Sequence, residues 1–100
     1  MIIVVFRFHL MADADLKKFE TLSQKMGEIV SKMAGFHGVK DFSAQDGEIV
    51  VIAEFDSLES VDTWKSHPKH QAVQKLGKEK FFADYQIQVC DLIRTQEFKV

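Results

Sequence analysis

The sequence predicts a single α+β domain in which one four-stranded antiparallel sheet carries helices on one face. Residues 2–10 are β-branched and aromatic, as a strand requires. From Leu16 to Met33, apolar residues recur at spacings of three and four, which is typical of an amphipathic helix. Asp46-Gly47 is a strong two-residue hairpin signal. The resulting order, β-α-β-β-α-β, is that of the ferredoxin-like fold.

The remaining elements follow from turn and capping residues. Asp13 or Asp15 caps the first helix, and Gly35 ends it. The hairpin joins strands at 37–45 and 48–55, and Ser57 caps a second helix that includes Trp64. Pro68 breaks that helix and opens a short one that ends near Gly77. Residues 85–94 form the last strand.

Composition limits the classes of function. The chain has 100 residues, is 46% hydrophobic and has a net charge of −2, which excludes disorder and a whole-surface attraction to nucleic acid or anionic membrane. A single cysteine, Cys90, excludes an internal disulfide and an all-cysteine metal site. The sequence has no targeting signal and no apolar run long enough to span a membrane, so a cytoplasmic location is expected. The expected organisation is one domain, 1–100, with a tail at 95–100.

Several strands are apolar on both faces, although helices can cover only one. The residues expected on the uncovered face are Ile3, Val5, Val50, Ile52, Cys90 and Leu92. An open apolar sheet face marks an interface or a ligand site. We therefore expect a homodimer of two facing sheets, with the tail long enough to reach the partner.

The densest group of chemically useful side chains lies between Trp64 and Tyr85. Trp64 offers a rigid stacking face, and His67 and His70 are three residues apart, so one helical face could hold both. Two histidines alone are weak evidence for a metal, and no metal site is predicted. These residues either line a pocket or are a core anchor with two surface histidines. The five lysines between Lys65 and Lys80 are either a solvated face or a patch that attracts a phenolate-like ligand.

Arg7 and His9 lie on the face of the first strand that is assigned to the dimer. A buried arginine must be paired, so Arg7 either meets an acid or faces a polar ligand. The acids considered on other strands are Asp41, Glu54 and Asp91.

The stretch EFDSLESVDTWKSHPKHQAVQKLGKEKFFADYQIQV resembles the antibiotic biosynthesis monooxygenases of the dimeric α+β-barrel superfamily. The matching features are Trp-Lys followed by His-Pro-x-His, a Gln, a Gly, an aromatic pair and a Tyr strand, and the resemblance spans residues 2–94. It implies oxygenation of quinols, phenols or anthrones without a cofactor. A related branch degrades haem, but Gln74 falls where that branch has a histidine, which argues against haem oxygenation.

Two hypotheses follow. In the first, the protein is a monooxygenase in which His70 or His67 accepts a proton and Tyr85 or Arg7 stabilises the oxyanion charge. The residues expected to bind a small aromatic substrate are Trp64, Arg7, His9 and Phe82. In the second, it is a non-catalytic dimer that binds a small hydrophobic metabolite in the same pocket.

Overall fold

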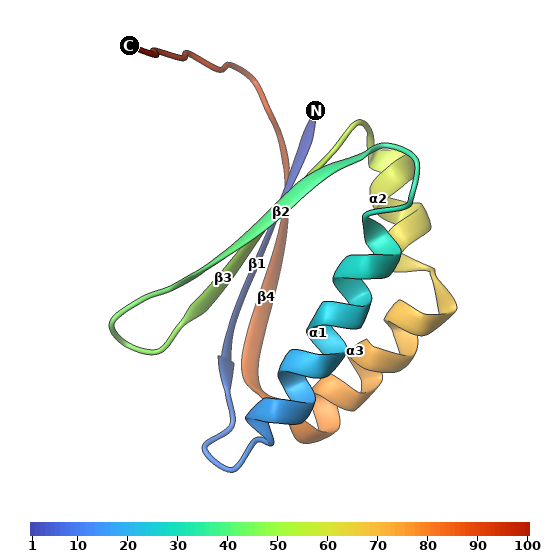
Figure 1. The fold of residues 1–100 in the computed structure, drawn as a ribbon, viewed down its shortest axis with the longest axis vertical. Helices are drawn as coiled ribbons and strands as arrows, with labels where there is room; N and C mark the ends of the chain where they lie inside the picture. Colours follow the sequence, from blue (N-terminus) through green and yellow to red (C-terminus); the bar gives the residue numbers. More distant parts are fainter.

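The structure, a computed structural model, describes residues 1–100 and confirms the predicted α+β fold (Figure 1). Four antiparallel strands form one sheet in the order β2-β3-β1-β4, and the helices cover one of its faces. The elements are β1 (Ile2–Leu10), α1 (Leu16–Val30), β2 (Phe36–Ser43), β3 (Ile49–Phe55), α2 (Leu58–Lys65), α3 (Pro68–Lys80) and β4 (Phe82–Asp91). The second helical region is split at Pro68, as predicted.

Helix α1 begins at a recognisable capping residue and ends before the predicted glycine. Of the two candidate caps, Asp15 is the one used: its Oδ1 accepts a hydrogen bond from Lys18 N at 3.1 Å. The helix ends at Val30, so the prediction that it continues through Met33 and is ended by Gly35 is wrong. Gly35 then adopts a φ of +84°, and a Cβ there would lie 2.1 Å from Ser60 Oγ. This position therefore needs glycine both for its backbone conformation and for its space.

The β2–β3 hairpin has a longer loop than the Asp46-Gly47 pair predicted. Ala44 N donates to Glu48 O at 2.8 Å, and Gly47 N donates to Ala44 O at 3.1 Å. Gly47 has a φ of +90°. This is the three-residue hairpin loop, in which a tight turn is followed by a left-handed residue. The loop moves the strand ends to Ser43 and Ile49.

Helix α3 does not stop at Gly77, which corrects the sequence prediction. It continues to Lys80, and Gly77 is buried inside it. A Cβ at Gly77 would lie 2.4 Å from Cε2 of the Phe82 ring. The glycine is therefore explained by the close packing of an aromatic ring against the helix, and not by a helix end.

Strand β4 begins and ends three residues earlier than the predicted range of 85–94. It pairs with β1 from Leu10↔Phe82 to Ile2↔Asp91, and the last bond runs from Leu92 N to Met1 O. The strand ends where its only partner in the sheet ends. Leu92 therefore lies outside the sheet, and the tail leaves the body of the molecule as an extended segment (Figure 1).

The two faces of the sheet are covered to different extents. Six residues are buried, and all of them belong to the layer between the helices and the sheet. They are Phe8, Val30, Phe55, Val61, Gly77 and Phe81. On the opposite face, Ile3, Val5, Val50 and Ile52 are only partly buried, because no element of the chain lies over them. The open apolar face predicted from strand composition is present.

Candidate functional site

The structure separates the predicted site residues into two groups on opposite faces of the sheet. The even-numbered residues of β1 face the helices: Phe8 packs against Phe19 of α1, and Val4 packs against the cluster that contains Val61 of α2. Arg7 and His9, which alternate with them, therefore lie on the open face. The helix-covered side holds the remaining predicted residues: Trp64, His67, His70, Phe82 and Tyr85.

Trp64 and His70 form a stacked pair at the α2–α3 break. Their ring centroids are 4.0 Å apart and their planes differ by 11°. His70 Nδ1 also lies 3.1 Å from the main-chain oxygen of Trp64. Because a carbonyl oxygen only accepts hydrogen bonds, Nδ1 must carry the proton, which leaves Nε2 as the nitrogen with a free lone pair.

His67 is held in the opposite tautomer. It is the N-cap of α3, and its Nδ1 accepts a hydrogen bond from Lys69 N at 3.1 Å. In the neutral ring Nδ1 is therefore the acceptor, and Nε2 carries the proton. The basic nitrogen of His67 is thus used to cap a helix, while that of His70 is free.

Burial lowers the pKa of His70 below the ordinary histidine value, because a charged ring is poorly solvated at this position. The proximity of His67 lowers the pKa further, and the bond to Trp64 partly opposes the shift. His70 is therefore neutral at neutral pH and able to accept a proton.

Phe82 and Tyr85 belong to an aromatic cluster beneath α1 and α3. The ring of Phe82 packs against Phe6, Phe8 and Phe19 at centroid distances of 5.5, 5.0 and 6.1 Å. Phe82 thus has a packing role. Tyr85 lies at the margin of the cluster, with 43% of its surface exposed, and Lys78 Nζ is 5.9 Å from its ring centroid.

An apolar strip that sequence reasoning missed continues from Tyr85 along β4. Ile87 and Val89 share its face of the strand and are 46% and 49% exposed, so the helices leave this margin of the sheet uncovered. We call Tyr85, Ile87 and Val89 the β4 strip. The alternation of apolar residues in the last strand indicates that these three side chains share one face. The lysine-rich segment before it is the sequence feature that contains Lys78.

Helix α3 contacts β4 and runs in the opposite direction to it (Figure 1). Lys78 marks the Tyr85 end. Trp64, which stacks on His70, packs against the same buried cluster as Val4, and Val4 is opposite Val89 in the register of the sheet. Lys78 is eight positions after His70, which is a rise of about 12 Å along the helix, and the strip spans about 13 Å. Lys78 thus lies beside the Tyr85 ring, and His70 lies near the other end of the same helix.

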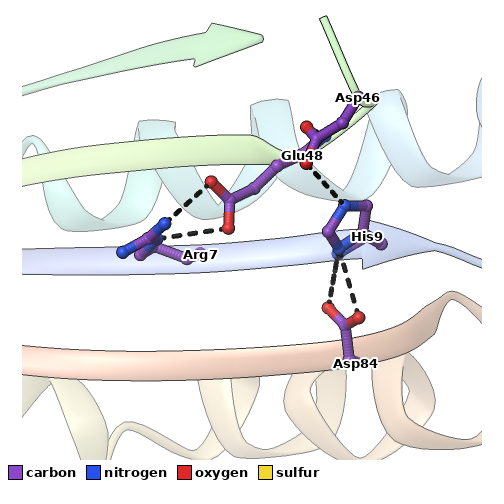
Figure 2. A network of polar contacts seen from close by, with 5 residues as sticks. All are labelled: Arg7, His9, Asp46, Glu48 and Asp84. Atoms are coloured by element: carbon purple, nitrogen blue, oxygen red, sulfur yellow. Dashed lines mark hydrogen bonds and ion pairs between the residues drawn. The ribbon is translucent and has the colours of Figure 1, made fainter. Parts of the chain in front are cut away.

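The open face carries a charged cluster at the end near the β2–β3 loop (Figure 2). Arg7 donates through Nε and NH2 to the two carboxylate oxygens of Glu48 at 3.2 and 3.0 Å. This corrects the predicted partners of Arg7. In the sheet register, Glu54 is opposite Ile3 and Asp91 is opposite Ile2, both too far along the strand. Asp41 lies in β2, which β3 separates from β1. Glu48, just before β3, is the acid that reaches Arg7.

His9 lies between two carboxylates in the same cluster. Its Nδ1 is 3.0 and 3.1 Å from the oxygens of Asp84, and its Nε2 is 3.8 Å from Asp46 Oδ2 (Figure 2). The hydrogen bond with Asp84 raises the pKa of His9 and lowers that of Asp84. An open depression of about 240 Å³ lies at this cluster, lined by Arg7, His9, Glu48, Asp84, Tyr85 and Gln86. No group of three or more His, Cys, Asp or Glu side chains is arranged to hold a metal ion.

The fold and these sites define an α+β protein of the ferredoxin-like type with an aromatic–histidine pair at the helix break. A sequence profile of the antibiotic biosynthesis monooxygenase family matches residues 1–76. The chain therefore belongs to the antibiotic biosynthesis monooxygenase family, and the resemblance seen in the sequence is confirmed.

Individual relatives are distant. YqjZ, an uncharacterized protein of Bacillus subtilis (strain 168), is 25% identical over 77 residues, which are 77% of this chain and 68% of that protein. Rv0793 from Mycobacterium tuberculosis superposes with a TM-score of 0.82 at 18% identity, over 96% of this chain and 98% of that one. SnoaB, a cofactor-independent oxygenase from Streptomyces nogalater, superposes with a TM-score of 0.77 at 14% identity, over 94% of each chain. At these identities the two structures establish a common fold.

None of the helices combines the length and the hydropathy needed to cross a membrane.

Proposed function

We propose that the protein is a monooxygenase that oxidises a small aromatic substrate of the quinol, phenol or anthrone type without a cofactor. The observation that carries the proposal is the geometry of His70: its ring stacks on Trp64 and its Nδ1 bonds to the Trp64 carbonyl, which leaves the basic Nε2 free. The exposed β4 strip belongs to the same side of the sheet. Family membership supports the reaction class. Of the two histidines considered from the sequence, we assign proton acceptance to His70.

The β4 strip offers a flat aromatic substrate an apolar surface. Burying aromatic carbon against Ile87 and Val89 would contribute about 25 cal/mol per Å² of apolar area removed from water. Lys78, at the Tyr85 end, would attract a phenolate and stabilise negative charge on an oxygen atom as it develops. The phenolic hydroxyl of Tyr85 would donate a hydrogen bond to the same oxygen. Phe82 would support this site from beneath rather than contact the substrate.

In the proposed reaction, the substrate supplies the electrons. His70 Nε2 removes a proton from an acidic C–H group, and the carbanion that forms transfers electrons to dioxygen and bonds to one of its oxygen atoms. For a methylene group, one oxygen atom ends as the carbonyl of the product and the other leaves as water with the two hydrogens. His70 returns its proton in the second half of the cycle, so the protein is unchanged.

The test is oxygen consumption with a panel of quinols and anthrones, comparing two variants. His70→Gln keeps an amide that can bond to the Trp64 carbonyl but removes the base, so turnover should fall about 10²- to 10⁴-fold. His67→Asn is the matched control, because asparagine is also a good helix cap, and its turnover should change little. Full turnover in His70→Gln would contradict the assignment.

The alternative, a non-catalytic binding protein, is favoured by the open β4 strip, because nothing in the chain encloses it to exclude water. It predicts that a quinol changes the fluorescence of Trp64, the single tryptophan, with no oxygen consumed by the wild-type protein. Haem is the control ligand, and a Soret band shifted by histidine ligation would support a haem-binding relative.

We further propose that the protein is a homodimer in which a second copy covers the open sheet face. Ile3, Val5, Val50 and Ile52 there are apolar and no element of the chain covers them. Ile93 and Phe98 in the tail are 92% and 88% exposed, and in a dimer such side chains would find a partner surface. With six buried residues, the core of one copy is small, and association would add to it.

A further inference from the structure

The charged cluster of Arg7, His9, Asp46, Glu48 and Asp84 is not used by the proposed reaction. It lies on the opposite face of the sheet from the Trp64–His70 pair. It joins three regions, since Arg7 and His9 come from β1, Glu48 and Asp46 from the β2–β3 hairpin, and Asp84 from β4 (Figure 2). In the register of the sheet, Arg7 is directly beside Val50 and Gln86. The cluster is thus continuous with the apolar part of the open face.

The charges of this cluster do not balance. Three carboxylates, Asp46, Glu48 and Asp84, face one guanidinium, which forms a bidentate pair with Glu48. Two negative charges remain while His9 is neutral, and one remains when it is protonated. His9 is the group in contact with both unmatched carboxylates. Its protonation therefore decides how much uncompensated charge this end of the face carries.

We propose that the open face is an interface between two copies of this chain whose strength depends on the protonation of His9, so that the copies associate when His9 is charged and separate as it becomes neutral. This rests on the homodimer proposed above. A two-fold dimer uses the same face of both copies, so both clusters are affected together. Covering the face removes water from carboxylates that water otherwise solvates, and an unmatched carboxylate resists that transfer.

The direction of the pH effect follows from the groups around His9. The hydrogen bond with Asp84 raises the pKa of His9, burial opposes this shift, and the charges of Asp84, Asp46 and Glu48 raise the pKa further. Covering the face also removes water from the two unmatched carboxylates, and their attraction for the His9 proton strengthens when that water is excluded. The dimer therefore binds the His9 proton more tightly than the monomer does. By linkage, association takes up protons, and the dimer weakens as pH rises through the pKa of His9.

The experiment is sedimentation equilibrium of the full chain at about pH 6 and about pH 8. In the wild type, the dimer dissociation constant should rise at least about tenfold between these values. His9→Gln should remove the dependence. His37→Gln is the matched control: His37 is also half-exposed and bonded to a carboxylate, that of Asp56, but it lies outside the cluster. This variant should keep the full dependence.

A second variant tests the same proposal in case His9→Gln does not fold. Asp46→Asn keeps the side-chain oxygen that accepts a hydrogen bond from Glu48 N but removes one unmatched charge. It should strengthen the dimer at about pH 8 and reduce the dependence on pH. A wild-type dimer whose dissociation constant does not change with pH would overturn this inference and leave the homodimer intact. A chain that stays monomeric at every concentration would overturn both.

Discussion

The two faces of the sheet share the same strands but differ in what covers them. On the helix-covered face Phe8 is 2% exposed and packs among aromatic rings, whereas Arg7 and His9, its neighbours in β1, lie in an ionic cluster on the open face. A histidine occurs near each face, and their pKa values shift in opposite directions: burial lowers that of His70, and Asp84 raises that of His9. The difference shows that the chemistry of a side chain here is set by its surroundings and not by its residue type.

The largest effect that tests this comparison is the loss of core packing. Phe8→Ala should destabilise the fold by about 3–5 kcal/mol, because it leaves a cavity in the aromatic cluster. Val5→Ala, on the open face of the same strand, should cost about 1 kcal/mol or less in the monomer. Urea denaturation at several protein concentrations measures both. A cost for Val5→Ala that grows with concentration would indicate that a second copy covers the face.

The next effect compares two helical glycines. Gly77→Ala should destabilise the fold by about 1–3 kcal/mol, because its Cβ would meet the Phe82 ring within the packed cluster. Gly27→Ala in α1 should instead stabilise it by about 0.5–1 kcal/mol, since nothing lies within 4 Å of the new Cβ and alanine favours the helix. Thermal or urea unfolding distinguishes them, and a stabilised Gly77→Ala would show that the Phe82 ring moves aside easily.

A smaller effect concerns the two histidines directly. In a titration followed by NMR of the ring protons, His70 should have a midpoint below the ordinary histidine value of about 6.5 and His9 a midpoint above it. Asp84→Asn should bring the midpoint of His9 down and leave that of His70 unchanged. If the two midpoints coincide, the electrostatic contrast between the faces is wrong.

The smallest expected effect is the pH dependence of stability due to the exposed His9–Asp84 pair. Because the folded-state pKa of His9 is raised, its contribution is complete below the unfolded value of about 6.5 and is lost as pH rises through the folded one. The lowered pKa of Asp84 makes its contribution complete above about 3.9 and lost as pH falls through the folded value.

The difference in unfolding free energy between wild type and Asp84→Asn should therefore be greatest between about pH 4 and pH 6.5. The pKa of His70 is lowered, so His70 acts in the opposite sense: its contribution falls as pH drops below about 6.5. A difference that persists unchanged to high pH would contradict the role of His9.

The sequence by itself determined the order of elements, the split second helix and the open apolar face. These features depend on local spacing, on proline geometry and on the alternation of strands, which can be seen in the chain without knowing its partners. It also identified Trp64 and His70 as members of the candidate site and the family to which the chain belongs.

Only the tertiary structure decided where the helices and strands end and which atoms meet. In the sequence Gly77 is typical of a helix end, but in the structure it makes room for the Phe82 ring. Strand β4 ends at Asp91 because β1 has no further residue to pair with it. The pairing of Arg7 with Glu48 depends on strand register, and the opposite tautomers of His67 and His70 depend on single hydrogen bonds. Such contacts join residues through space, and local sequence patterns do not record them.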